Sequence, residues 1–147
     1  MKKIILIFSV IFLVGCSDES KNIDSQSIDK NETFNWRLVT SWPKNYPGLG
    51  MAPERIADLV EEMSDGQMKI TVYGAEEQVP AFGVFDAVSS GSHQMGHSGG
   101  YFWKGKVPAA QFFTSVPFGL TADEINAWVN RGGGLELWRE IYAPFNI

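Results

Sequence analysis

Cysteine and histidine, the residues that build disulfides and most metal sites, are nearly missing from this sequence. Among 147 residues there are one cysteine, Cys16, and two histidines, His93 and His97. A single cysteine can form no internal disulfide, although an oxidising compartment would permit one. On a strand the histidines would lie about 13 Å apart, too far for one metal ion. On a helix their spacing would suit zinc, but Gly91 and Gly96 argue against a helix. We therefore expect no metal site in this chain and take His97 as a satisfied polar residue at a strand end.

Basic residues are also scarce. The chain has 12 lysines and arginines against 17 aspartates and glutamates, a formal net charge of −5 at pH 7. Removal of a leader that contains Lys2 and Lys3 would leave 10 bases against 17 acids, a charge of −7. Without a basic patch, nucleic acid is not expected as a partner. An anionic small ligand is still compatible with this composition, because one local positive group can override an acidic surface.

Catalytic motifs are scarce as well. Ser98 lies in residues 96–100, which match the letters Gly-x-Ser-x-Gly, but the strand predicted there runs into a loop and not into the helix that a nucleophile elbow needs. No Lys-Ser/Thr pair follows Gly99-Gly100 as a phosphate-binding loop would require. Glu76 and Glu77 are adjacent and point apart, so a solvated loop explains them better than general acid–base chemistry. We expect a protein that is not an enzyme. An exported hydrolase is the alternative, and a His–Ser contact near 3 Å would support it.

The first 33 residues resemble a leader and a tether. Residues 4–14 are almost wholly apolar and follow two lysines, but they are too short for a mature membrane span. Residues 1–15 therefore predict a secretory signal peptide. Its LVGC ending resembles a bacterial lipobox, in which Cys16 becomes a lipid-modified first residue; an ordinary signal peptide is the alternative. Residues 16–33 are polar and lack aromatic side chains, so they predict a flexible tether. The expected location is the periplasm, with a lipid anchor in a membrane.

Residues 34–147 contain all five tryptophans, and their pattern begins as an α/β fold. Strands are predicted at 35–41 and at 68–73, where Met68, Ile70 and Val72 share a face. Between them, Pro53–Ser64 predicts a helix that ends at Asp65-Gly66. Its apolar stripe consists of Ile56, Leu59, Val60 and Met63.

The second unit continues this alternation. Pro80 is expected to open a helix that buries Phe82, Phe85 and Val88 and ends at Gly91, and a short strand follows at 94–98. Such a βαβαβ run predicts a right-handed parallel sheet. Residues 107–119 predict an irregular buried segment or an edge strand. Thr121 and Glu124 predict a capping box. The helix behind it has Ile125, Trp128 and Val129 on its apolar side, and after Gly132–Gly134 a last helix carries Leu135, Trp138, Ile141 and Tyr142.

The stretch 74–103 is where we expect the ligand, because open α/β sheets bind at the carboxyl ends of their strands. Large aromatics in predicted loops can form the walls of such a cleft. These are Trp42, Tyr46, Tyr101, Phe102, Trp103 and Phe118. Tyr101 follows two glycines after a strand, which makes its hydroxyl a reasonable donor to a ligand oxygen. Core packing is an equal alternative for Phe102, Trp103 and Phe118.

Three long runs carry a family resemblance: WRLVTSWPKNYPGLG, SGGYFWKGKVPAAQFF and VPFGLTADEINAWVNRGGGLELWRE. Together with the 64–91 run and Met95–His97 they closely resemble the solute-binding proteins of TRAP transporters (tripartite ATP-independent periplasmic transporters), the DctP-type family. The resemblance covers about residues 36–147. It is strongest to the branch that binds 2-oxo or 2-hydroxy monocarboxylates such as pyruvate or lactate.

The resemblance implies the first lobe of a type II periplasmic-binding fold, incomplete at its C-terminal side. It implies capture of an organic acid for a membrane permease, with a homodimer left open. In this branch an arginine holds the carboxylate and a metal ion often bridges protein and ligand. Both would lie beyond the last helix of this chain, which we therefore expect to be an N-terminal fragment that binds weakly alone. Here the resemblance implies ligand contacts from Tyr101, Gln78, Phe118 and Trp42, with Trp103 as support for the loop.

Two alternatives stand beside this interpretation. Lys104 and Lys106 are the cations expected near the cleft, and a solvated loop is the simpler explanation of both. A binding module of a sensor or of another uptake system is the alternative function, and a kinase or permease segment in the same gene would favour it.

Overall fold

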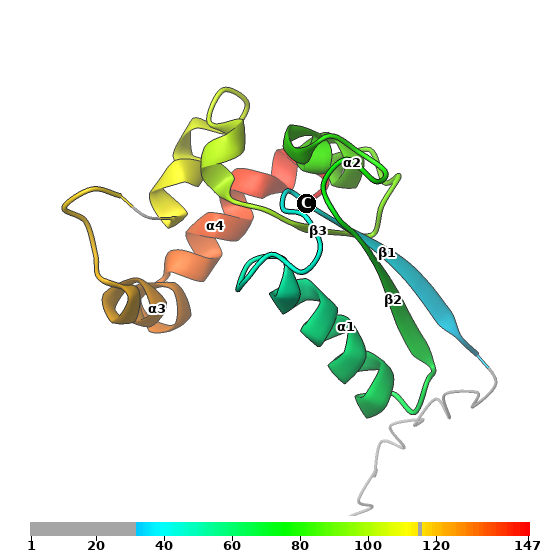
Figure 1. Cartoon of the computed structure of the whole chain (residues 1–147). Helices are drawn as coiled ribbons and strands as arrows, with labels where there is room; N and C mark the ends of the chain where they lie inside the picture. Colours follow the sequence, from blue (N-terminus) through cyan, green and yellow to red (C-terminus); the bar gives the residue numbers. More distant parts are fainter. Residues whose placement is uncertain (1–31, 115) are drawn as a thin grey trace, which may run out of the picture.

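The computed structural model describes residues 32–114 and 116–147 and contains a three-stranded parallel sheet (Figure 1). The strands are β1 (Phe34–Thr40), β2 (Met68–Tyr73) and β3 (Met95–His97), in the order β2-β1-β3. In the register, Leu38 lies opposite both Val72 and Met95. The predicted parallel arrangement is confirmed, with strand bounds close to those expected. The predicted signal peptide, lipidated cysteine and most of the tether lie outside the described residues.

Helix α1 (Met51–Met63) joins β1 to β2 and covers one face of the sheet, where Ala57 packs with Leu38, Ile70 and Val72. The predicted helix is confirmed, but its predicted apolar stripe is largely wrong. Ile56 and Met63 are exposed, Met63 by 84%. The buried side is Pro53 and Ala57, with Val60 packed partly against the sheet. Both stripes share the helical period, and the side with small residues lets the helix approach the strands closely.

A 3-10 turn at Ala81–Gly83 and helix α2 (Val84–Ser89) cover the opposite face, where Val84 and Ala87 pack on Val39. Neighbouring strand residues point to opposite faces, so Leu38 faces α1 while Val39 faces α2. Phe85 is buried as predicted. Phe82 is 69% exposed, which corrects the expectation that it is buried. Its 3-10 turn has three residues per turn rather than 3.6, which turns Phe82 away from the buried side of α2.

The contact between α2 and β3 depends on a glycine. A Cβ atom at Gly96 would lie 2.8 Å from Val84 Cγ1 and 2.9 Å from Val88 Cγ2. Gly96 therefore lets α2 lie directly on β3. Beyond the strand, the chain forms two more 3-10 segments, Gly100–Trp103 and Pro108–Phe113. The second includes part of the predicted irregular segment: Val107 and Ala110 are buried, whereas Phe112 is exposed.

Two helices, α3 (Ala122–Arg131) and α4 (Gly134–Tyr142), form a hairpin beside the sheet (Figure 1). Thr121 and Glu124 form the predicted capping box. Gly133 turns the chain with φ +84, a left-handed conformation that glycine adopts without a Cβ clash. A final 3-10 turn spans Ala143–Phe145. No helix in the described ranges is both long enough and apolar enough to span a membrane.

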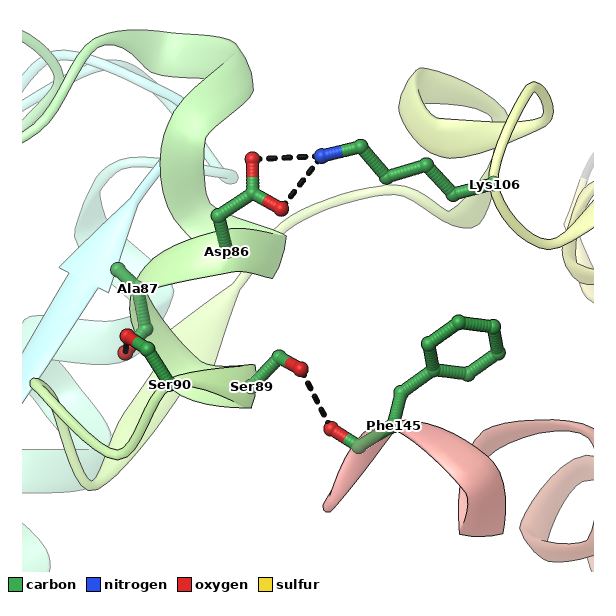
Figure 2. Close-up of polar contacts among 6 residues, drawn as sticks. All are labelled: Asp86, Ala87, Ser89, Ser90, Lys106 and Phe145. Atoms are coloured by element: carbon green, nitrogen blue, oxygen red, sulfur yellow. Dashed lines mark hydrogen bonds and ion pairs between the residues drawn. The ribbon is translucent and has the colours of Figure 1, made fainter.

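Helix α2 connects the sheet to this C-terminal hairpin. Its Phe85 packs in a cluster with Val107, Ala110 and Tyr142. Figure 2 shows two polar links from the same helix: Asp86 pairs with Lys106 at 2.5 Å, and Ser89 Oγ donates to the Phe145 carbonyl at 2.6 Å. The sheet and the hairpin are thus held together through one short helix.

Candidate functional site

A polar network joins three segments at the carboxyl ends of β1 and β3. Ser41 Oγ donates to the Ala81 carbonyl at 2.6 Å and lies 2.5 Å from Ser98 Oγ. Because Ser41 has one hydroxyl proton, Ser98 must be the donor in their contact. The backbone N–H of Ser41 also donates to the His97 carbonyl at 3.1 Å. The network fixes the ends of both strands against the start of the turn before α2.

The other face of the same strand ends holds Thr40 and His97. The register pairs these residues, and Thr40 Oγ1 lies 3.3 Å from His97 Nδ1. Thr40 Oγ1 also accepts from the Trp42 backbone N–H at 3.2 Å. Burial lowers the pKa of His97 below its ordinary value of 6.5, so the ring is neutral at physiological pH.

Five rings gather around these groups, and we call them the aromatic cluster: Trp42, Phe82, His97, Tyr101 and Phe102. The Trp42 ring lies 5.0 Å from His97 and 6.1 Å from Phe102, measured between centroids. Phe102 in turn lies 5.0 Å from Phe82 and 4.5 Å from Tyr101. The cluster is partly open, since Tyr101 is 44% exposed. It forms an apolar wall with a phenol hydroxyl at the carboxyl edge of the sheet, where a ligand is expected.

The structure brings together some of the four predicted ligand contacts. Trp42 and Tyr101 both contact Phe102. Gln78 is exposed on the loop after β2, which is tied to Trp42 by a bond from the Ala75 N–H to the Trp42 carbonyl at 3.0 Å. Phe118 is fully exposed on the loop before α3, and Figure 1 shows that loop on the far side of the hairpin from β1 and β2. As ligand contacts, all four stay predictions.

Phe82, His97 and Lys44 were not predicted as parts of this site from the sequence. Phe82 matched an apolar helical period, and His97 matched a satisfied strand end. The one available signal for His97 was its position at the carboxyl end of a predicted strand. Phe82 lies well beyond the strand predicted at 68–73 and had no such signal. Trp103 was expected to support the loop, and it packs against Phe85 while its Nε1–H donates to Tyr142 Oη at 2.7 Å.

Most of the charged groups near this edge have partners. Lys44, in the loop after β1, lies 3.5 Å from Glu77, and Glu77 accepts from the Gly74 N–H at 3.1 Å. Glu76 accepts from the Ala81 N–H at 3.1 Å. Lys106 pairs with Asp86, and Lys104 is exposed. Both glutamates thus shape the loop after β2, and Lys44 and Lys106 already pair with acids.

One histidine–serine contact has the distance expected of a hydrolase, but its hydrogen bond runs in the opposite direction. His93 Nδ1 lies 3.1 Å from Ser92 Oγ, and the same hydroxyl donates to the Ala87 carbonyl at 2.8 Å. The serine proton is therefore committed, and His93 must donate to Ser92 rather than accept from it. A general base has to accept the nucleophile's proton. This pair does not support the hydrolase alternative.

A second concave region lies on the α2 side of β3. It has a volume of about 680 Å³ and is lined mainly by apolar residues, among them Val84, Met95, Trp138 and Tyr142, together with Arg139. Thr40 and His97 face the α1 side and do not line this region, whereas Ser98 of the polar network does. Among residues 32–114 and 116–147, no group of three His, Cys, Asp or Glu side chains could hold a metal ion.

Comparison with known proteins identifies relatives of this fold. A curated monocarboxylate 2-oxoacid-binding periplasmic protein from Nostoc sp. is 47% identical over 112 residues, 76% of this chain and 30% of the relative. A TRAP periplasmic solute-binding protein from Pseudoalteromonas atlantica, solved with sodium and pyruvate, is 46% identical with a TM-score of 0.75. One from Colwellia psychrerythraea, solved with calcium and pyruvate, is 42% identical with a TM-score of 0.75.

The overlap with both solved proteins has the same extent: it covers 78% of this chain and 35% of theirs. The chain thus spans about a third of the length of these relatives. Their shared fold confirms the predicted α/β lobe of a periplasmic binding protein. The model of the family described as bacterial extracellular solute-binding protein, family 7 (DctP), matches residues 38–146. The chain therefore belongs to family 7 of the bacterial extracellular solute-binding proteins.

Proposed function

We propose that this chain supplies one lobe of a receptor that captures a small 2-oxo or 2-hydroxy monocarboxylate outside the cytoplasm. The receptor would deliver its ligand to a TRAP membrane permease. Membership in a family of solute-binding proteins supports a transport component rather than an enzyme. The two solved relatives at 46% and 42% identity contain pyruvate, which supports a small organic acid as the ligand.

The observation that carries the proposal is the aromatic cluster at the carboxyl edge of the sheet. Ligand clefts combine apolar walls with a few placed polar groups, and Trp42 with Phe102 supplies such a wall beside the Tyr101 hydroxyl. A carboxylate also needs a charged partner when it is desolvated. Lys44 and Lys106 already pair with acids. We therefore propose that these residues orient the acid while its main counter-ion comes from another part of the receptor.

A hybrid receptor tests this division of roles. Residues 36–147 replace the matching segment of the Nostoc relative, and tryptophan fluorescence follows titration with pyruvate, lactate and longer 2-oxo acids. We expect saturable binding by the hybrid and weak, millimolar binding by the isolated chain. Tyr101→Phe removes one hydrogen bond, so the hybrid should lose about two- to tenfold in affinity, which corresponds to roughly 0.5–1.5 kcal/mol.

Arg139→Gln is the matched control, because Arg139 lines the second concave region beside α4 and is no part of the aromatic cluster. It should leave the affinity of the hybrid unchanged. Loss of binding in Arg139→Gln with full binding in Tyr101→Phe would move the site to that region. A hybrid that folds but binds none of the acids would contradict the proposed ligand class.

Alanine variants of Trp42, Gln78 and Phe118 in the hybrid rank the other proposed contacts. Trp42 should matter most, because it belongs to the aromatic cluster. Gln78 and Phe118 are exposed here, so they can contribute only where the rest of the receptor lies against them. An unchanged affinity in either variant would remove that residue from the site.

A metal ion accompanies pyruvate in both solved relatives. The described residues do not fit such an ion, since no three of their His, Cys, Asp or Glu side chains come together. The carboxylates of Glu76 and Glu77 already accept hydrogen bonds from backbone N–H groups. We therefore assign no metal ligand in this chain. Calcium or sodium added to the isolated chain should leave its tryptophan fluorescence unchanged.

We also propose that residues 1–15 direct export and that Cys16 carries a lipid in the periplasm. Several acyl chains would hold the protein at a membrane, since each buried CH₂ group adds about 0.8 kcal/mol. Expression with the native leader in a Gram-negative host should place the protein in the membrane fraction, with an acyl mass increment on the peptide that begins at Cys16. Cys16→Ser should shift it to the soluble fraction. An unmodified Cys16 thiol in the exported protein would contradict lipidation.

A further inference from the structure

His97 has one ring nitrogen engaged and one available. Its Nδ1 lies 3.3 Å from Thr40 Oγ1. Within the two described ranges, 32–114 and 116–147, no hydrogen bond to its Nε2 is present. The residue is half-buried, and its ring lies beside Trp42, within the aromatic cluster. What His97 can offer a ligand therefore depends on which nitrogen carries the proton.

The surroundings of Thr40 settle the position of that proton. Thr40 has 0% of its surface exposed, so its hydroxyl hydrogen needs a partner inside the protein. Its oxygen already accepts from the Trp42 backbone N–H at 3.2 Å. The acceptor within reach of the hydroxyl hydrogen is His97 Nδ1. Thr40 thus donates to Nδ1, and the proton of a neutral imidazole lies on Nε2.

The charge state agrees with this tautomer. Burial lowers the pKa of His97, which keeps the ring neutral near pH 7. The two nitrogens lie on different edges of the imidazole ring, so the Nε2–H points away from Thr40. The aromatic cluster around the ring reduces competition from water, and a hydrogen bond made there is stronger than one in bulk solvent.

We propose that His97 binds an acceptor oxygen of the organic acid through its neutral Nε2–H, with Thr40 as the residue that positions the ring and fixes the tautomer. This inference rests on the proposed function, because it adds a third polar contact to the same site. Because the donor is neutral, its recognition of a carboxylate or 2-oxo oxygen depends on the direction of the N–H bond and not on an ionic attraction. The ligand would then accept hydrogen bonds from both Tyr101 and His97, while Trp42 forms the apolar wall of the site.

Nuclear magnetic resonance of the intact chain tests both halves of the proposal. The nitrogen chemical shifts of ¹⁵N-labelled histidine distinguish a protonated Nε2 from a protonated Nδ1 without any ligand. Titration with sodium pyruvate to millimolar concentrations then reports weak binding at each ring. We expect His97 in the Nε2–H form, with its Nε2 signal and the Trp42 and Tyr101 signals moving together.

Two substitutions separate a ligand contact from a structural role. His97→Asn places an acceptor near Thr40 but lacks the second donor, whereas His97→Gln carries an amide close to the position of Nε2. Pyruvate affinity should fall about two- to tenfold in His97→Asn, the range expected for one lost hydrogen bond. It should be largely restored in His97→Gln. A purely structural role would give the reverse order.

Each remaining outcome counts against the proposal in its own way. A protonated Nδ1 in the free chain would overturn the tautomer assignment, whatever the ligand does. Pyruvate shifts at Trp42 and Tyr101 but not at His97 would remove His97 from the site and leave the proposed function intact. No shift at any of the three residues would overturn the His97 contact and also count against pyruvate-like acids as the ligand class.

Discussion

His93 is a buried base with one ring nitrogen that makes no hydrogen bond to any residue in 32–114 or 116–147. It is 7% exposed, and its Nε2 lacks a hydrogen bond within the described residues. Because Ser92 donates to Ala87, His93 donates through Nδ1, and protonation would place a charge on the buried Nε2. Burial, with a smaller contribution from the positive charge of Arg37, lowers the pKa of His93 below its ordinary value of 6.5.

This residue should make stability depend on pH. A histidine whose pKa is lower in the folded state stabilises the fold above its unfolded pKa, and this contribution is lost as pH falls. The free energy of unfolding should therefore decrease from about pH 7.5 to about pH 5.5, as measured by urea denaturation. His97, whose pKa is also lowered, acts in the same direction.

The double variant His93→Asn/His97→Asn is the control for this prediction. Asparagine at 93 keeps a donor for Ser92, and neither asparagine titrates. The slope between the two pH values should flatten in the variant. An equal slope in the variant and the original chain would show that other groups cause the pH dependence.

Gly99 leaves room for the ring of Tyr101. A Cβ atom at position 99 would lie 2.6 Å from two carbons of that ring, so Gly99→Ala should push Tyr101 out of its place. The ring is exposed and rotatable, and the stability change should therefore stay within about 0.5 kcal/mol. The near-UV circular dichroism and pyruvate affinity of the hybrid should change. Gly105→Ala, where a Cβ meets nothing within 4 Å, should change neither.

At the scale of single residues, the sequence predicts a role when the position along the chain indicates it. It does not predict a role that depends on a residue far away in the sequence. Tyr101 stood out because it follows two glycines after a strand. His97 did not, because its possible role depends on Thr40, which lies 57 residues away along the chain. Phe82 looked like a core residue, and only the 3-10 turn beneath it shows why it joins the aromatic cluster instead.

Among the elements, α3 depends most visibly on its first turn. Thr121 Oγ1 accepts from the Glu124 N–H, and the Glu124 carboxylate accepts from the Thr121 N–H at 2.8 Å. The half-buried apolar side of α3 consists of Ile125, Trp128 and Val129, so its tertiary anchoring is modest. Local capping should therefore carry much of its stability.

Thr121→Ala removes one half of the capping box and should cost about 1 kcal/mol. Hydrogen exchange of the α3 amides, measured by mass spectrometry, should accelerate while the amides of β1 and β2 stay protected. Thr121→Ser keeps the hydroxyl and should exchange like the original chain. Equal exchange in the alanine and serine variants would show that the cap does not limit the opening of α3.

The elements themselves were largely predictable, because each had a local signal. Alternation marked β2, the capping box marked α3, and Gly133 marked the break before α4. The buried side of α1 was not predictable in the same way. Two apolar stripes fit one helical period, and the choice of Ala57 over Ile56 depends on how closely the strands let the helix approach.

For the molecule as a whole, stability should depend on the cluster that joins α2 to the hairpin. Trp103 Nε1–H donates to Tyr142 Oη inside this cluster, and burial raises the pKa of Tyr142. Tyr142→Phe leaves the indole N–H without its acceptor. We expect a loss of about 1–3 kcal/mol in the free energy of unfolding, measured by urea denaturation.

Tyr46→Phe is the matched control, since Tyr46 is half exposed in the loop before α1 and should unfold like the original chain. If Tyr142→Phe unfolds like Tyr46→Phe, water must replace the lost acceptor, and the cluster is more open than its packing indicates. The placement of the α3–α4 hairpin against α2 was the least predictable feature, because no sequence pattern pairs Tyr142 with Trp103.

The central strand, β1, is synthesised before the two strands that pair with it. β1 leaves the ribosome before the other two strands, yet Thr40 pairs with His97, 57 residues further along. Parallel pairings over such separations form slowly, and an unpaired strand edge is a template for other strands. During synthesis and refolding, Leu38 and Val39 therefore lie on a strand that can pair wrongly. A chaperone that holds extended apolar segments would find a binding site at Phe34–Thr40.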